Sequence, residues 1–431
     1  MPIEKCILVK DRGGKTMDRI TKEKLGRYGL SIRANRKHQL HISNNAYRWT
    51  QKEFCKDICS QNALINMEKG LAGRFHDNYI LLAEKLGFKI THNPEIDQQI
   101  PPLTKRLYHA LEFYDLDEIK SITQQLSDCL TNVKDYLWYG DLYRVVKAVE
   151  KHYLNKENLS RDDRHFFIDM LEEFSDEWDD IIKLLVFYSA FLDFDSEEYR
   201  DLFYDLNIAS SKADFNKLCT LLYYQAENYS SKLYALFQEL EAEWMEKKNI
   251  MRLIDLYNQE LIHKSYFDVY ELRQIEEKIK KMIQEYSIPK QKLAEVYFSL
   301  GATYLKMREY PKAIEMMQKC IENDLKKKQH SFAYLAYAQH MLGQTIVIPH
   351  YTEEEQSQLP PIYDKIYSYY SKFGHISAEH SENFLMDEIL PLFYPDDELI
   401  VEMFQEELTM LIEQTNHYKT LTIYIKKTKK V

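Results

Sequence analysis

Glycine is scarce over most of this chain, and its distribution restricts the possible folds. Seven of the 11 glycines fall before residue 90, and the 341 residues that follow contain only four. A β-rich fold needs glycine and proline for its many tight turns, and this long segment is poor in both. We therefore expect an all-α fold, with a change of organisation near residue 90.

Charge changes at the same place as glycine content. Residues 1 to 90 hold 18 Lys and Arg against 9 Asp and Glu, a net charge of +9, and the remaining residues hold 39 against 59, a net charge of −20. A basic segment joined to an acidic one is typical of a nucleic-acid-binding module attached to a domain that stays off DNA. A chain of 431 residues also predicts two or more domains.

Several function classes are disfavoured by composition and motifs. The chain has 45% hydrophobic and 29% charged residues, without an apolar run of membrane-spanning length or a signal peptide, so we expect a cytoplasmic protein without a membrane partner. The six cysteines are dispersed and form no CxxC pair. Phosphate-cradling glycine loops, HExxH helices and nucleophile elbows do not occur. We expect no catalytic residue, no metal site and no cofactor.

The segment WTQKEFCKDICSQNALINMEKG carries the sharpest pattern in the sequence. Thr50 and Glu53 have the spacing of a capping box that starts a helix at Gln51, and Ser60 can cap a second helix that ends at Gly70. The apolar residues that would face one another between these helices are Phe54, Ile58, Leu64 and Met67. Two short helices joined by a tight turn have the geometry of a helix-turn-helix.

Residues 22 to 88 resemble the Cro/C1-type helix-turn-helix family. Leu25 and the SIRANR run are similar to its first helix, and HDNYILLAEKLGF is similar to its closing helix. The resemblance implies that the second helix of the pair enters the major groove of double-stranded DNA. Gln51 would contact phosphate and help hold that helix, while the amides of Gln61, Asn62 and Asn66 would reach base edges. The remaining DNA-binding candidates are Arg33, Arg36, Lys52, Ser60, Lys69 and Arg74.

One segment departs from the family pattern. Arg36 and Gln51 are 15 positions apart, about twice the family spacing, because KHQLHISNNAYR (residues 37–48) stands between them. A wing, a dimer contact and an idle loop are all compatible with this insertion. The resemblance therefore leaves the roles of Arg33 and Arg36 open.

The proline-containing run THNPEIDQQIPP interrupts helical periodicity where composition changes, and we expect a linker there. The predicted organisation is an N-terminal extension (1–20), a helix-turn-helix domain (21–92), the linker (93–102) and a repeat domain for ligand binding and dimerisation (103–431). Met17, which follows an Arg-Gly-Gly-Lys run, is a candidate for the natural start.

The segment AEVYFSLGATYLKMREYPKAIEMMQKCIEND matches the tetratricopeptide pattern. Gly301 and Ala313 would let two antiparallel helices approach closely, and Tyr297, Leu300 and Tyr304 would fill the seam between them. Because a single repeat cannot bury its own face, we expect neighbouring helical pairs that form a right-handed superhelical array.

A helix-turn-helix followed by such an array resembles the RRNPP family of peptide-pheromone-sensing transcriptional regulators. The resemblance implies a quorum-sensing homodimer in which a short signalling peptide binds the repeat domain and alters DNA binding. The candidate peptide-binding residues are Asn207, Asn216, Asn228, Glu295, Phe298, Ala302, Leu305, Tyr334, Tyr337 and His340.

Two alternatives use the same architecture. The array could dock another protein, as a scaffold or as an antagonist of a signalling partner, with the DNA-binding head as an accessory. The same peptide response could also serve a phage or plasmid switch. A groove lined by Asn and Tyr would favour a peptide, whereas a broad apolar patch on the convex side would favour a protein.

Overall fold

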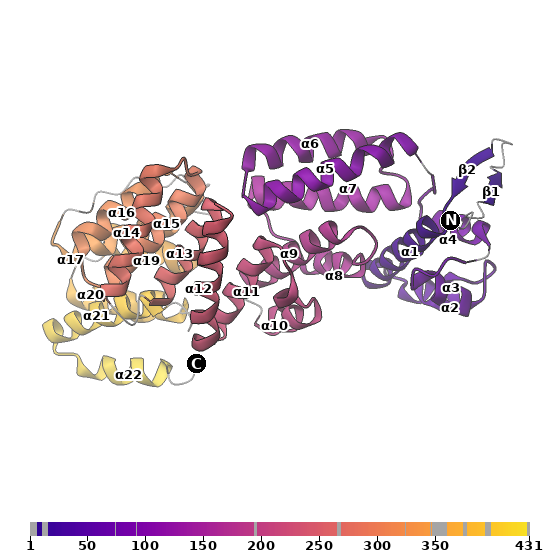
Figure 1. Ribbon diagram of the computed structural model, residues 1–431. Coiled ribbons are helices and arrows are strands. Elements are labelled where there is room, and N and C mark those ends of the chain that lie inside the picture. Colours follow the sequence, from indigo (N-terminus) through magenta and orange to yellow (C-terminus); the bar gives the residue numbers. More distant parts are fainter. Residues whose placement is uncertain are drawn as a thin grey trace. The chain divides into compact units, whose positions relative to one another are not determined.

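A computed structural model describes most of the chain (Figure 1). It covers residues 7–10, 16–73, 75–91, 93–193, 196–264, 269–323, 325–344, 346, 360–373, 377–392 and 398–428. The chain divides into two compact units, Met1–Arg252 and Leu253–Val431. The division does not coincide with the boundary at residues 93–102 that composition favours.

Helices dominate the described residues, which confirms the expectation of an α-helical protein. Two short strands, β1 (Ile7–Lys10) and β2 (Thr16–Ile20), are the exception, and they pair antiparallel, with Val9 opposite Met17. The predicted N-terminal extension therefore contains a hairpin that lies before the first helix.

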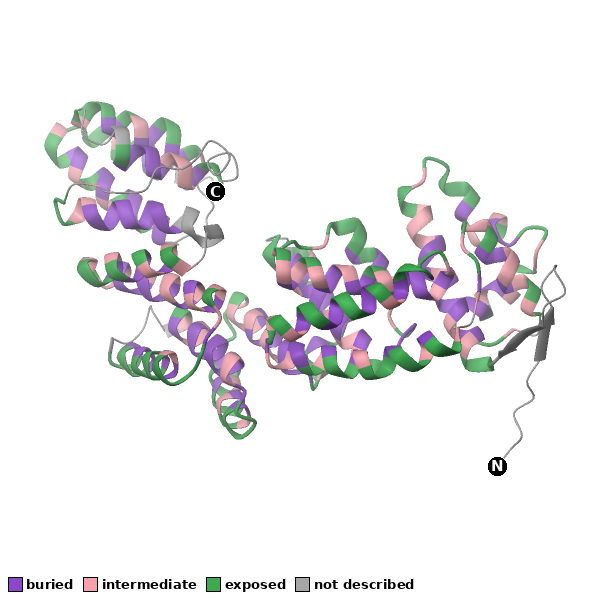
Figure 2. Ribbon diagram, turned by 90° about the horizontal axis from the view of Figure 1, so that it is seen from above, coloured by how far each residue is buried: buried purple, intermediate pink, exposed green. Residues whose placement is uncertain are grey.

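The first unit is built from helices that are buried along one side and exposed along the other (Figure 2). Its helices are α1 (Lys22–Ile42), α2 (Gln51–Phe54), α3 (Gln61–Glu68), α4 (His76–Lys85), α5 (Pro94–Glu112), α6 (Leu116–Thr131), α7 (Leu137–Glu150), α8 (Arg161–Asp169), α9 (Asp176–Leu192), α10 (Ser196–Asp205), α11 (Asp214–Ala226) and α12 (Ser230–Glu246), with short helical turns η1 (Ala46–Trp49), η2 (Lys151–Asn155) and η3 (Ile208–Ser210). Helices α5, α6 and α7 pack side by side (Figure 1). One core joins them to α9 and α11 through fully buried residues such as Leu107, Leu126, Val146 and Phe187.

The linker expected at residues 93–102 is wrong, because this segment forms the start of α5. Asn93 caps the helix, with its Oδ1 accepting from the backbone N–H groups of Glu95 and Ile96 at 3.1 and 3.3 Å. Pro94 occupies the first turn, where its missing N–H costs nothing. Pro101 and Pro102 lie inside the helix, where each lacks the backbone N–H of a helical hydrogen bond. Burial of the apolar face that includes Ile100 and Leu107 compensates for this loss.

The first half of the insertion at residues 37–48 is an extension of α1. Residues 37–42 continue that helix, and η1 follows after a short turn. The extension packs on α8, where Lys37 pairs with Asp169 and the rings of His38 and Phe166 lie 4.8 Å apart. The segment is therefore neither a wing nor an idle loop, because it joins the N-terminal helices to the helices that follow.

A buried polar cluster fastens α1 to the adjoining helices. Ser31 donates a hydrogen bond to the carboxylate of Asp141, and the Asn35 amide donates to both oxygens of Asp141 at 3.0 and 2.9 Å. Glu173 is fully buried beside them, and neither of its carboxylate oxygens has a hydrogen-bond partner among the described residues. Burial raises the pKa of Asp141 to about 6, and burial together with the charge of Asp141 raises the pKa of Glu173 well above its usual value.

The second unit contains the segment with the tetratricopeptide pattern. Its helices are α13 (Ile250–Lys264), which begins at the boundary, α14 (Val269–Glu285), α15 (Lys290–Lys306), α16 (Tyr310–Asn323), α17 (Leu325–Met341), α19 (Pro361–Ser368), α20 (Ala378–Phe384), α21 (Glu398–Thr415) and α22 (Tyr418–Thr428), with helical turns η4 (Tyr369–Phe373), η5 (Leu385–Ile389) and η6 (Leu390–Leu392). Helix α15 packs on both α16 and α17.

The seam between α15 and α16 has the close approach that the pattern predicts. A Cβ atom added to Gly301 would lie 2.7 Å from Met317 Cε, and Ala313, Leu300 and Tyr304 are buried there. The pairing of these two helices is confirmed.

The unpartnered carboxyl of Glu173 makes the stability of the first unit depend on pH. A carboxyl with a raised pKa in the folded state stabilises that state most at low pH, and stability falls as the pH rises through the folded-state value. We expect Glu173→Gln to raise the melting temperature at pH 8, because it removes a buried negative charge, and to change it little at pH 5, where the carboxyl is protonated. The expected rise is about 2 to 4 °C for each kcal/mol gained in the free energy of unfolding.

Circular dichroism melts of the full chain at both pH values measure this effect. Glu172→Gln is the matched control, because the neighbouring Glu172 side chain is exposed. A lower melting temperature for Glu173→Gln at both pH values would contradict the assignment.

Candidate nucleic-acid interface

Helices α2 and α3 form the pair of short helices that the sequence predicts. The Ser60 hydroxyl caps α3 by accepting from the backbone N–H of Ala63 at 3.2 Å, and Gly70, at φ +74°, ends the helix. The predicted capping box is wrong. Thr50 precedes α2, but its hydroxyl donates to the carbonyl of Tyr47 at 2.8 Å, so the preceding turn η1 sets the start of α2.

The small core between the helices is confirmed. Phe54, Leu64 and Met67 are buried, and Ile58 packs against them. Residues from α1 and α4 complete the cluster; they include Leu25, Ile32, Tyr79 and Leu82. Four helices thus share one interior, which holds α3 from behind.

Helix α1 touches the backbone at the end of α3 through two glycines. A Cβ atom at Gly26 would lie 2.5 Å from the carbonyl oxygen of Gly70, and one at Gly29 would lie 1.9 Å from that of Met67. Real side chains cannot occupy these positions without moving α3. The spacing of these glycines, one turn apart on α1, therefore sets the distance between α1 and α3.

A buried ion pair locks the orientation of the same helices. Arg36 on α1 binds Glu68 on α3 with two nitrogens, at 2.5 and 3.1 Å, and its third nitrogen donates to the carbonyl of Trp49 at 2.8 Å. The amide of Gln51 also donates to Glu68, at 2.7 Å. The prediction that Arg36 contacts phosphate is wrong, because its guanidinium is buried and bonded within the protein. Gln51 does help to hold α3, as the resemblance implies.

Arg33 is likewise occupied inside the chain. Its guanidinium donates to the carbonyls of Asp169 and Leu171, at 3.1 and 3.2 Å, and to that of Glu68 at 3.3 Å. These bonds tie α1 to the turn after α8, so the prediction of a phosphate contact is wrong for Arg33 too. Arg74 lies outside the described residues.

The outward face of α3 is polar and exposed. Asn62, Asn66 and Lys69 follow one another at helical spacings of four and three residues, so they form a row on one face. Leu64, Met67 and Glu68 occupy the opposite face and are buried. Gln61 is exposed in the first turn beside the row. No hydrogen bond joins the side chains of Gln61, Asn62 or Asn66 to any other described residue.

Exposed basic side chains occur in this row and in the segment before α3. Arg48, Lys52, Lys56 and Lys69 are exposed, and the contact of Lys56 with Glu53 is long, at 3.7 Å. Such pairs at the surface contribute little, which leaves the cations open to an anionic partner. Amide side chains can donate hydrogen bonds to bases and accept them, and nearby lysines can neutralise phosphates.

Glu68 is the residue that sequence reasoning missed. An acidic residue at the end of a recognition helix is at odds with DNA binding if it faces the duplex. It faces inward instead, and the only signal for this was its spacing of four residues from Leu64, on the buried side of the helix.

The three asparagines predicted to bind a peptide lie in different surroundings. Asn207 and Asn228 adopt left-handed backbone conformations, with φ of 50° and 55°, at the ends of helices, where asparagine is favoured. Asn216 is buried and donates to the carbonyl of Asp180 at 3.1 Å. The three residues thus have separate structural roles.

The candidate groove residues of the second unit divide into two groups. Leu305, Tyr334 and Tyr337 are buried. The two tyrosine rings pack against further tyrosines of the chain, with ring centroids 6.1 Å apart for Tyr334 and Tyr363 and 6.0 Å apart for Tyr337 and Tyr370. The more accessible members are Glu295, Phe298, Ala302 and His340.

A cavity of about 330 Å³ nevertheless lies beside two of the predicted groove residues. Leu305 and Tyr337 line it together with Arg308 and Glu406, and the Tyr337 hydroxyl donates to Glu406 at 2.5 Å. Two of the predicted peptide-binding residues thus line one cavity, which lies between the end of α15, α17 and α21.

Other kinds of site are not apparent in the described part of the chain. None of its helices has an apolar stretch of membrane-spanning length. No group of three His, Cys, Asp or Glu side chains in the same residues is placed to hold a metal ion.

Comparison with known proteins adds no family. No family model matches the chain, and no curated protein or solved structure matches it. Any statement of function therefore depends on the geometry described above and on the motif resemblances.

The close approach of α1 and α3 gives a direct test of how the polar face is positioned. We expect Gly29→Ala to destabilise the first unit by about 1 to 3 kcal/mol, because the added methyl would meet the backbone of Met67. Thermal melts of the full chain, with hydrogen exchange of the α3 amides, measure the destabilisation.

Gly73→Ala serves as the control for this substitution. Its added methyl would have nearest neighbours at 3.4 Å, an ordinary contact distance. Equal melting of Gly29→Ala and wild type would show that the close approach is not a constraint.

Proposed function

We propose that this chain is a sequence-specific DNA-binding transcriptional regulator with a helix-turn-helix formed by α2 and α3. The observation that carries the proposal is the row of Asn62, Asn66 and Lys69 on the exposed face of α3. An amide can donate to and accept from one adenine at the same time, which suits Gln61 and the two asparagines for reading bases.

The surroundings of α3 support this role. Its buried face is fixed by Glu68 and Met67, so the polar face is held in one orientation before any partner binds. A rigid helix loses little entropy on docking, as a recognition helix should. The net charge of +9 over residues 1 to 90 provides the electrostatic attraction that phosphate requires.

A homodimer is part of the proposal. One short recognition helix reads only a few base pairs, and regulators of this type gain specificity by placing two such helices about 34 to 36 Å apart on one face of the duplex. We assign dimerisation and ligand binding to the helices that follow residue 103, arranged as a superhelical array of pairs, and cytoplasmic location follows from this role.

The proposed ligand of the array is a short signalling peptide. The cavity beside Leu305 and Tyr337 is of the size that one or two apolar side chains fill, and the ion pair of Arg308 and Glu406 lies at its edge. A peptide offers both its side chains and its backbone groups to such a surface.

Base reading by α3 can be tested with duplexes selected by the wild-type chain from a random library. We expect Asn62→Ala and Gln61→Ala each to weaken binding of a selected duplex by about 1 to 3 kcal/mol, because each removes an amide that pairs with a base, with little effect on an unrelated duplex. Gel-shift titrations at fixed salt concentration measure both affinities.

Asn132→Ala is the control, because Asn132 is an exposed amide at the end of α6, away from α3. Wild-type affinity of the α3 variants would refute the role of these side chains. Failure of the wild-type chain to select any sequence would leave a docking scaffold as the better description.

The peptide response is tested with the same gel shift. Peptides encoded by small open reading frames next to the gene are added, each with a scrambled version of equal composition. We expect one native peptide to shift the midpoint of DNA binding while its scrambled version does not. If DNA binding is sequence-specific but no peptide alters it, the peptide proposal fails and the DNA-binding proposal stands.

A further inference from the structure

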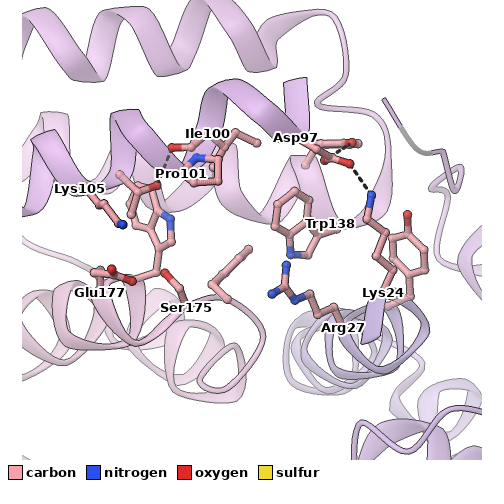
Figure 3. A pocket seen from close by; sticks show the side chains of 14 residues that line it. Lys24, Arg27, Asp97, Ile100, Pro101, Lys105, Trp138, Ser175 and Glu177 are labelled. Carbon is pink, nitrogen blue, oxygen red and sulfur yellow. Dashed lines mark hydrogen bonds and ion pairs between the residues drawn. The ribbon is translucent and has the colours of Figure 1, made fainter. Parts of the chain in front are cut away.

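A cavity of about 310 Å³ lies beside α1 in the first unit, away from the polar face of α3. It lies between α1, α5, α7 and the start of α9, and Figure 3 shows the side chains that line it. Its volume is near the lower end of the range for small-molecule sites. A compound about as large as one or two amino-acid residues would fill it.

Five aromatic rings line the cavity. The rings belong to Tyr28, Trp138, Tyr139, Phe174 and Trp178. Such walls favour a flat or branched apolar body, which gains from both burial and ring contacts.

Most polar groups of the lining already have partners. Lys24 pairs with Asp97, whose other oxygen accepts from the Tyr139 hydroxyl at 2.7 Å. The Tyr28 hydroxyl donates to the carbonyl of Thr91 at 2.8 Å. These side chains are therefore held in place by bonds within the protein and are not available to bind a ligand.

Two donors remain for a ligand. Arg27 contacts only Glu23 among the described residues, at 2.8 Å, and the Glu23 side chain is 74% exposed, so that pair is weak. The indole N–H of Trp138 is buried without any hydrogen-bond partner in the described part of the chain. In Figure 3 the nitrogen edge of Trp138 and the guanidinium of Arg27 point toward one another.

Outside the pair of Lys24 and Asp97, the charged residues that line the cavity have a net positive charge. Arg27 and Lys105 contribute two positive charges to the lining, and Glu177 contributes one negative charge. A ligand with one negative charge would balance them, and a carboxylate can accept from both an N–H of Arg27 and the indole of Trp138.

We propose that this cavity binds a small carboxylate with an aromatic or branched apolar body, held by Arg27 and Trp138. The carboxylate can belong to a free organic acid or to the C-terminal residue of a peptide, since the two share the same chemistry. Because the cavity lies between α1 and the helices after residue 93, the bound compound fixes α1 against them. An effect on DNA recognition rests on the proposed function, whereas binding itself does not.

Tryptophan fluorescence of the full chain tests binding directly, because two of the four tryptophans line the cavity. The probes are phenylpropionate and 4-methylpentanoate, each with its methyl ester, and tripeptides that end in Phe, with either a free or an amidated C-terminus. We expect saturable binding of at least one carboxylate, and binding of its ester or amide to be about tenfold weaker, as expected for loss of a charge-assisted hydrogen bond.

Two variants and a control identify the residues responsible. Arg27→Gln is expected to weaken carboxylate binding about tenfold and to leave ester binding unchanged. Trp138→Phe keeps an aromatic ring but removes the N–H, and should also weaken carboxylate binding. Arg106→Gln removes the same charge on α5 at an exposed residue that pairs with Glu118 outside the cavity, and should bind as wild type does. Circular dichroism of each variant verifies folding.

The outcomes separate the possible sources of the ligand. Binding of the free acids alone indicates a small-molecule effector, and binding of the peptides alone indicates a peptide C-terminus. If no carboxylate binds saturably, or if Arg27→Gln binds as tightly as wild type, the proposal is overturned. None of these measurements uses DNA, so their failure would be distinct from a failure of the regulator proposal.

Discussion

The buried ion pair between Arg36 and Glu68 is the interaction on which the polar face of α3 depends. Its two charges are almost fully removed from water, and such a pair is tolerable only because the guanidinium also bonds to the carbonyl of Trp49 and the carboxylate also accepts from Gln51. Loss of either partner would leave a buried charge without compensation. The pair therefore specifies one arrangement of α1, α2 and α3, and the outward row that begins at Asn62 is a consequence of that arrangement.

Helix α1 has a second set of partners, and this makes the N-terminal helices part of a larger unit. Ser31 and Asn35 bind Asp141 on α7, while Arg33 bonds to the carbonyls of Asp169 and Leu171 after α8. If the N-terminal helices were joined to the rest of the unit only by a flexible linker, a conformational change in one part would not affect the other. Here α1 packs both on α3 and on the helices after residue 93. A change in the packing of those helices can therefore move α1 and α3, because densely packed interiors shift between distinct arrangements and do not deform gradually.

Local features of the sequence predicted local structure well. The position of Ser60, the apolar spacing of Phe54, Leu64 and Met67, and the small residue Gly301 in the α15 seam each act over a few residues, and each has the predicted role. One failure is local, since the Thr50 hydroxyl bonds to Tyr47 and does not cap α2, whereas the linker and the surface arginines failed because of partners far away in the chain. Prolines at residues 94, 101 and 102 favoured a linker because nothing local reveals that α5 is held by a core.

The roles of polar residues depended on the same distant contacts. The sequence alone suggests that Arg36 is an exposed cation, because its partner Glu68 lies 32 residues later. The partner of Ser31, Asp141, is 110 residues away and could not be predicted either. The cavity beside Arg27 follows the same rule, since its walls come from four helices that no single motif connects. Sequence patterns therefore predicted the short helices α2 and α3 and the buried residues between them, whereas only the assembled helices show that α1 lies between α3 and the cavity. A ligand in this cavity would contact α1. The position of α1 determines both the orientation of the polar face of α3 and the buried cluster at Asp141.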